Sequence, residues 1–156
     1  IPRRGVFIRQ LRPVELMEMF EAMAEIEASC GRLAAKRMRD ADLGALAEAN
    51  NRCQEAVNGA DSDSYCAENE VFHQIIYRGA ANSFLEKQAL RLQNRLKAYR
   101  RVQLKFRGRM VQSMSEHSQI LNALENGDAE RAATVLRSHV AVQGEKFHQL
   151  VASFKR

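Results

Sequence analysis

The chain has 156 residues, of which 46% are hydrophobic and 28% are charged, and its formal net charge is +5. This length suits a single domain that buries roughly 70% of its unfolded surface, so the chain can hold an interior site. Its apolar runs fall far short of the roughly 20 residues of a transmembrane helix, and its three cysteines form no C-x-x-C motif. We therefore expect a cytoplasmic protein with reduced thiols and no membrane segment.

Apolar residues recur every three or four positions through most of the chain, and only residues 5–8 (GVFI) resemble a short strand. A first helix is predicted from Pro13, which suits the first helical position, to about Arg39. Asp40 is predicted to cap a second helix, which ends within residues 58–64 (NGADSDS). The first helix carries a long apolar stripe, so it should pack against a core.

The same periodicity predicts four more helices. Asp61 or Ser62 should start the third, Asn82 should cap the fourth, and Gly127 and Asp128 should separate the last two. The expected ends of these helices lie near Gly79, Phe106, Asn126 and Phe154. Short connections between long amphipathic helices favour antiparallel neighbours, so the predicted fold is all-α, an antiparallel bundle of about six helices.

The positive charge is concentrated between Lys87 and Arg109, a stretch that contains no acidic residue. Such a run can bind nucleic acid or another polyanion. It can equally be the solvated face of one helix, which is the more common role of a charge run. The sequence leaves both interpretations open.

Three of the four histidines fall on apolar stripes of three different predicted helices. Asn69 and His73 project from one face, one helical turn apart, while His117 and His139 lie on the fifth and sixth helices. One such histidine is usually a hydrogen-bonded core residue, but an unpartnered buried imidazole costs on the order of 1–3 kcal/mol. A divalent transition metal would partner all three imidazoles at about 2.0–2.1 Å, with the Asn69 carbonyl oxygen as a fourth ligand.

A second metal hypothesis uses the two E-x-x-H sequences, Glu70 to His73 and Glu145 to His148, whose spacing is that of carboxylate-bridged di-iron bundles. It fits less well, because both glutamates fall off the apolar stripes. It also leaves His117 and His139 without a role.

Several stretches resemble one known family: FEAMAEIEASCGRLAA, NEVFHQIIYRGAANSFL and SEHSQILNALENGDAERAATVLRSHV. Together they are similar to the C-terminal effector-sensing domain (FCD) of FadR-subfamily regulators in the GntR superfamily. RRGVFI, near the start, resembles the end of a winged-helix wing. The resemblance implies that residues 1–12 are wing and linker, that residues 13–156 form the effector-binding helical domain, and that this chain lacks the DNA-binding domain.

The resemblance also implies a function and a site. Metal-binding members use D-x-x-x-H on one helix and a histidine on each of two later helices, which match Asn69, His73, His117 and His139. Such proteins typically bind a small carboxylate effector at the metal, form homodimers, and change the grip of a winged helix-turn-helix on operator DNA. Zinc is the first expectation for the metal, with nickel, manganese or iron as alternatives.

Two positions depart from the family pattern. Asn69 replaces the usual aspartate, so the site keeps a charge nearer +2 than +1, which weakens metal retention and favours an anionic effector. Met23 stands where many relatives carry an arginine that can contact an effector carboxylate. We expect Arg95, beside Leu92 and Tyr99, to supply the missing cation, although an arginine lying over the core edge is the alternative.

The leading prediction is therefore a ligand-sensing, dimerising regulatory domain that carries out no catalysis. One alternative is a metal-dependent hydrolase or oxygenase on the three histidines, with Glu116 as the nearest candidate base. Another is a basic module that binds nucleic acid directly through the run from Lys87 to Arg109.

Overall fold

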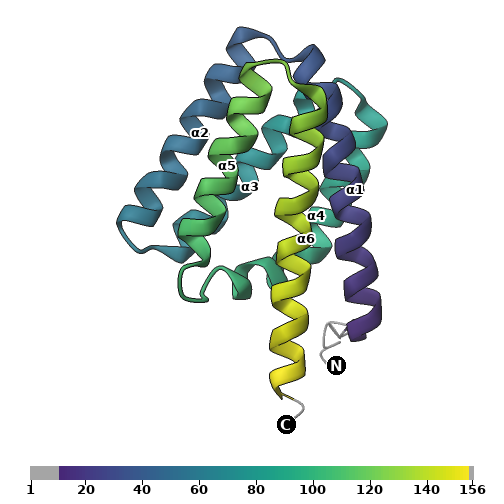
Figure 1. The fold of residues 1–156 in the computed structure, drawn as a ribbon, viewed down its shortest axis with the longest axis vertical. Coiled ribbons are helices and arrows are strands. Elements are labelled where there is room, and N and C mark those ends of the chain that lie inside the picture. The colour runs from purple at the N-terminus through teal and green to yellow at the C-terminus, as the bar shows by residue number, and fades with distance from the viewer. Residues whose placement is uncertain (1–10, 155–156) are drawn as a thin grey trace, which may run out of the picture.

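The structure is a computed structural model that describes residues 11–154, and within them the chain forms six helices and no strand (Figure 1). The helices are α1 (Pro13–Arg37), α2 (Asp40–Asn58), α3 (Ser62–Gly79), α4 (Ser83–Gln103), α5 (Arg109–Glu125) and α6 (Ala129–Phe154). The predicted all-α bundle is confirmed. The strand expected at residues 5–8 and the wing expected before α1 lie outside the described residues.

Short polar side chains start α3 and α4 as their sequence predicts. The Asp61 carboxylate accepts a hydrogen bond from the Ser64 amide at 3.0 Å, and the Asn82 side chain accepts one from the Leu85 amide at 3.0 Å. Between α5 and α6, Gly127 adopts a left-handed φ of 64°. Such a backbone favours glycine, so the helix stop predicted there has a local cause.

Two predicted helix ends are wrong. Asp40 does not cap α2 but is its first residue, and the capping contact comes from Asp42, which accepts a hydrogen bond from the Arg39 amide at 2.9 Å. The predicted end near Phe106 is also wrong, because α4 ends at Gln103. Residues 104–108 instead form turns, which finish at Gly108 with φ of 77°.

The first and last helices run antiparallel and side by side, so the start of α1 and the end of α6 lie at the same end of the bundle (Figure 1). This interface is close, since a Cβ atom added at Gly31 of α1 would overlap the Leu136 side chain of α6. Helices α2, α3 and α5 pack together on the other side of the bundle. The site described below lies where these two parts meet.

One main core joins all six helices of the described residues, and each contributes at least one fully buried apolar side chain. Examples are Phe20, Phe72, Leu96, Ile120 and Leu136. The three cysteines are free and buried. Among residues 11–154, no helix is both long and apolar enough to cross a membrane.

Candidate metal centre

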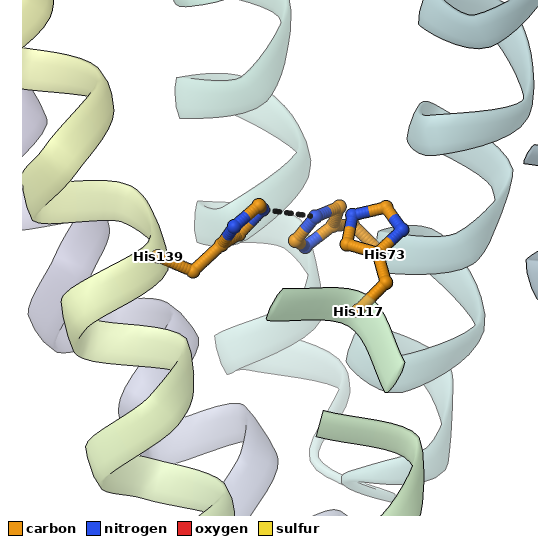
Figure 2. Close-up of side chains that lie close together, drawn as sticks. All are labelled: His73, His117 and His139. Atoms are coloured by element: carbon orange, nitrogen blue, oxygen red, sulfur yellow. Dashed lines mark hydrogen bonds between the residues drawn. The ribbon is translucent and has the colours of Figure 1, made fainter. Parts of the chain in front are cut away.

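Three histidines from three helices lie together inside the bundle (Figure 2). His73 comes from α3, His117 from α5 and His139 from α6, and each is at most 1% exposed. One ring nitrogen of each lies within 4.8 Å of those of the other two. The closest pair, His73 Nε2 and His139 Nε2, is 3.2 Å apart. The apolar stripes therefore bring these three side chains to one place.

Aromatic packing fixes the His117 ring. Phe72 stacks on it with ring centroids 4.1 Å apart and an interplanar angle of 6°, and Tyr65 stacks on it at 6.0 Å. His73 and His139 meet the same ring edge-on, with centroids 5.3 Å and 5.1 Å away. These contacts hold the His117 nitrogens in a fixed direction toward the other two histidines.

A carboxylate stands behind each of the other two rings. Glu27 Oε2, from α1, lies 3.2 Å from His73 Nδ1, and Glu116 Oε2, from α5, lies 2.6 Å from His139 Nδ1. An ionised carboxylate can only accept hydrogen bonds, so the Nδ1 atom of His139 carries a proton and donates it to Glu116. The contact between Glu27 and His73 lies within ion-pair distance but makes no hydrogen bond. In the neutral His139 ring the Nε2 atom is then unprotonated and has a lone pair that can bind a metal ion.

The orientation of Gln143 supports the same assignment for His139. Arg100 Nε donates a hydrogen bond to Gln143 Oε1 at 2.7 Å, and a guanidinium group has no acceptor, so the amide oxygen faces the arginine. The Gln143 amino group therefore faces His139, with Nε2 to Nε2 at 3.2 Å. Because that amino group only donates, His139 Nε2 must accept.

His73 Nε2 faces His139 Nε2, and the pair can share either a proton, in an N–H···N hydrogen bond, or a metal ion. Two ligand nitrogens at about 2.0–2.1 Å from a tetrahedral ion are about 3.3 Å apart. The observed separation of 3.2 Å matches that value. The geometry of this pair thus fits a shared divalent ion.

Other buried polar atoms also fit a metal. Neither ring nitrogen of His117 has a hydrogen-bond partner, and neither has the Asn69 Oδ1 atom, although both side chains are buried. Buried polar atoms without partners are rare, and a bound ion is one of the standard explanations. The donor set of imidazole nitrogens and one amide oxygen suits zinc and its neighbours in the first transition row.

Sequence comparison identifies the family. The FCD domain model matches residues 18–142. The chain belongs to the FCD domain family. The predicted resemblance to the C-terminal FCD domain of GntR-type regulators is thereby confirmed, and the chain is a domain of a transcription regulator, not an enzyme.

Solved structures support the fold of this FCD domain. It resembles E. coli McbR/YncC with a TM-score of 0.82 and 19% identity, over 90% of this chain and 71% of that one. It resembles Streptococcus agalactiae GntR with a TM-score of 0.73 and 17% identity, over 88% of this chain and 62% of that one. No curated protein matches the chain in sequence.

Two ion pairs, one buried and one half-buried, lie beside the histidines of the FCD domain. Glu27 Oε1 lies 3.4 Å from Arg100 Nη2 and also accepts a hydrogen bond from the Tyr77 hydroxyl. Burial would raise the pKa of Glu27, but its contacts with His73, Arg100 and Tyr77 outweigh burial and hold that pKa well below its usual range. Glu27 is therefore ionised, and its carboxylate lies beside both Arg100 and the Nδ1 atom of His73.

Glu116 is held in the same way on the opposite side. Its carboxylate lies 3.0 Å from Arg109 Nη1, and the Arg109 side chain is 2% exposed. Burial would raise the pKa of Glu116, yet the contacts with His139 and Arg109 lower it overall. Glu116 thus orients His139 from behind and does not face the shared centre, where a general base would have to lie.

Burial favours the neutral imidazoles that a metal needs. It lowers the pKa of His139 to about 4, even though Glu116 opposes the shift. Burial, together with His139 and His73, holds the pKa of His117 well below its ordinary value of 6.5. Both rings are therefore unprotonated at neutral pH, as metal ligands must be.

Arg95 lies elsewhere. Its side chain is exposed and lines a groove of about 720 Å³ between α1 and α4, together with Leu92 and Tyr99. None of the three histidines lines that groove. The expectation that Arg95 contacts an effector stays a prediction, but its position separates it from the buried site.

The di-iron hypothesis is wrong for this fold. Glu145 and His148 are exposed on α6, so the second E-x-x-H sequence does not face the interior. Glu70, in the first sequence, pairs with Lys97 at 3.3 Å near the surface. Neither carboxylate is placed to bridge two ions beside the histidines.

Sequence reasoning missed Glu27, Arg100, Arg109 and Gln143 as members of the site. The basic run contains both arginines, and its other members Lys87, Arg91, Arg95, Lys97, Arg101, Lys105 and Arg107 are exposed. A usable signal existed for Arg100, because Ala89, Gln93, Leu96 and Arg100 follow one helical stripe and all four are buried. The same signal marks Arg109, because Arg109, Ser113 and His117 follow one helical stripe of α5 and all three are buried.

Proposed function

We propose that this FCD domain senses a small organic acid at a divalent metal ion held by His73, His117 and His139, with Asn69 as the fourth ligand. Zinc is the first candidate, and nickel, manganese or iron are alternatives. The domain forms a homodimer and transmits effector binding to an N-terminal winged helix-turn-helix domain that binds operator DNA.

The facing Nε2 atoms of His73 and His139 carry this proposal. Each ring has a carboxylate on its Nδ1 side, and a carboxylate behind a histidine is the usual second shell of a metal ligand. His117 adds two further buried nitrogens that have no other partner.

Arg100 is the best candidate for holding the effector carboxylate. Its Nη1 atom is buried without a hydrogen-bond partner, while its Nε and Nη2 atoms contact Gln143 and Glu27 beside the histidines. A buried guanidinium with a free donor favours an anionic ligand group. It takes the role first expected for Arg95, since Arg95 is exposed in a separate groove.

The site gives ligand binding a route to the rest of the bundle. His73, His117 and His139 connect α3, α5 and α6, Glu27 adds α1, and Arg100 adds α4. A ligand that favours one packing of these five helices shifts the population of the dimer toward it. A coupling of 1–3 kcal/mol changes operator affinity roughly 5- to 150-fold.

The test uses the full-length regulator with its DNA-binding domain. Operator affinity is measured by fluorescence anisotropy at fixed salt, with and without a panel of small organic acids, for the parent and for His139→Ala. At least one acid should change the affinity of the parent by fivefold or more and leave the variant unaffected. An identical change in both proteins, or none with any acid, contradicts the proposal.

A further inference from the structure

The ionisable side chains of the site cancel one another's charge. Glu27 and Glu116 carry two negative charges, and Arg100 and Arg109 carry two positive ones in direct contact with them. The three histidines are neutral when they bind a metal. The fourth ligand position, Asn69, is an uncharged amide.

No other buried acid offsets a bound cation. Among the described residues, Glu27 is the only acidic side chain in the buried set, which otherwise consists of amides, arginines, histidines and one serine. Glu116 is 16% exposed and already paired with Arg109. A divalent ion in this interior would therefore leave two positive charges uncompensated, which a medium of low dielectric constant strongly disfavours.

We infer that Asn69 makes metal binding and anion binding depend on each other, so that the domain responds to the metal and a small anion together and not to either alone. This inference rests on the proposed metal site. Without an anion the metal is held weakly, because its charge stays uncompensated. Without the metal the anion can pair only with Arg100. Glu27, 3.4 Å from Arg100, already offsets the charge of that guanidinium. Because linkage is reciprocal, the anion raises metal affinity by the factor by which the metal raises anion affinity.

An acid at position 69 removes this dependence. Asn69 is 4% exposed on the buried face of α3, one turn before His73, so an added charge would lie about 6 Å from the His73 side chain, as positions i and i+4 of a helix do. Aspartate there supplies within the protein the negative charge that the anion otherwise brings. Alanine removes the amide oxygen but leaves the charge unchanged.

The experiment measures zinc affinity of this chain at pH 7 by competition with a chelating dye, with acetate absent and at saturating concentration, and with formate as a smaller probe. Three proteins are compared: the parent, Asn69→Asp and Asn69→Ala. Acetate or formate should raise the zinc affinity of the parent at least tenfold. In Asn69→Asp the affinity without anion should exceed that of the parent, and the anion effect should fall below about threefold. Asn69→Ala should keep the anion effect.

Two results overturn the inference in different ways. If the parent binds zinc with an affinity that neither anion changes, or if Asn69→Asp keeps the full anion effect, the mutual dependence is wrong while the metal site stands. If neither the parent nor Asn69→Asp binds zinc under any of these conditions, the metal site itself is wrong, and the inference is overturned with it. Circular dichroism of each protein establishes that the variants are folded.

Discussion

Arg95 and Arg100 lie five residues apart on α4 and have opposite surroundings. Arg95 points into the exposed groove beside α1, whereas Arg100 is 4% exposed and contacts Glu27 and Gln143 in the interior. Five residues turn a helix by about 140° beyond a full turn, so one charge run serves two faces. The role of a basic residue on α4 therefore depends on the residues that its side chain contacts, and not on the net charge of the segment.

The sharpest way to break this comparison is to remove each arginine in turn. Arg100→Met leaves Glu27 buried with its main cation gone, so the free energy of unfolding should fall by roughly 3–5 kcal/mol. Arg95→Met should change it by less than about 0.5 kcal/mol, because surface substitutions away from such contacts have small effects. Urea denaturation at pH 7 measures both. Equal losses in the two variants would mean that the buried ion pair contributes no more to the free energy of unfolding than the exposed arginine does.

The buried histidines also predict a pH dependence of the free energy of unfolding. His139, with its pKa lowered to about 4, and His117, with its pKa also lowered, bind fewer protons in the folded chain than in the unfolded chain. In chelator-treated protein, the stability they provide is therefore present above the unfolded value of about 6.5 and is lost as the pH falls toward 4. The loss should be about 1.4 kcal/mol per pH unit for each histidine, or roughly 3 kcal/mol for His139 over this range.

Urea denaturation at half-unit steps of pH measures this slope. A His139→Gln variant should retain only about half of it, while a variant of the exposed His148, His148→Gln, should match the parent. A slope that is the same in all three proteins would show that the interior histidines are not the groups responsible. Below about pH 4.5, ionised Glu27 adds a further loss, because its folded pKa is lowered.

A smaller effect is expected for Glu116, which contacts the proposed metal ligand His139 on the Nδ1 side of its ring. Glu116→Gln keeps the shape of the side chain but removes the charge that orients and polarises His139, so metal affinity should fall about 10- to 100-fold. The exposed Glu145→Gln should leave it unchanged. Competition with a chelating dye measures both affinities. An unchanged affinity in Glu116→Gln would show that this carboxylate only neutralises Arg109.

The smallest effect on stability is expected for Arg101, the residue that follows Arg100. Arg101 pairs with Asp63 at 2.8 Å, but both side chains are more than half exposed. Solvent and salt screen such a pair, so Arg101→Gln should leave the urea midpoint unchanged at 0.15 M salt. A shift as large as that of Arg100→Met would contradict the division of α4 into a functional and a solvated face.

Local signals predicted most of the fold. Asp61, Asn82 and Gly127 define helix boundaries through contacts within three or four residues, so the sequence alone locates them. The helical extension to Phe106 was wrong because the residues of 104–108 have no strong breaker until Gly108, and the turn there depends on the tertiary path of the chain.

The site was predictable only in part. Apolar periodicity placed His73, His117 and His139 on inward faces, and three such faces in one bundle lead to one interior. The partners of these histidines depend on contacts between distant segments, such as Glu27 with Arg100, 73 residues apart, and on the amide orientation of Gln143. The stripe of Ala89, Gln93, Leu96 and Arg100 could have distinguished Arg100 from Arg95, but periodicity does not give the rotation of each helix against its neighbours and so does not predict the partners of Arg100.

The most direct test of the central claim is the metal content of the purified chain. Elemental analysis and native mass spectrometry would compare the parent, a His117→Ala, His139→Ala double variant, and His148→Ala as an exposed control, each after incubation with zinc and acetate and removal of excess metal. We predict about one zinc ion per chain in the parent and in His148→Ala, and none in the double variant. Equal zinc content in all three proteins, or none in the parent, would contradict the account of an interior metal site.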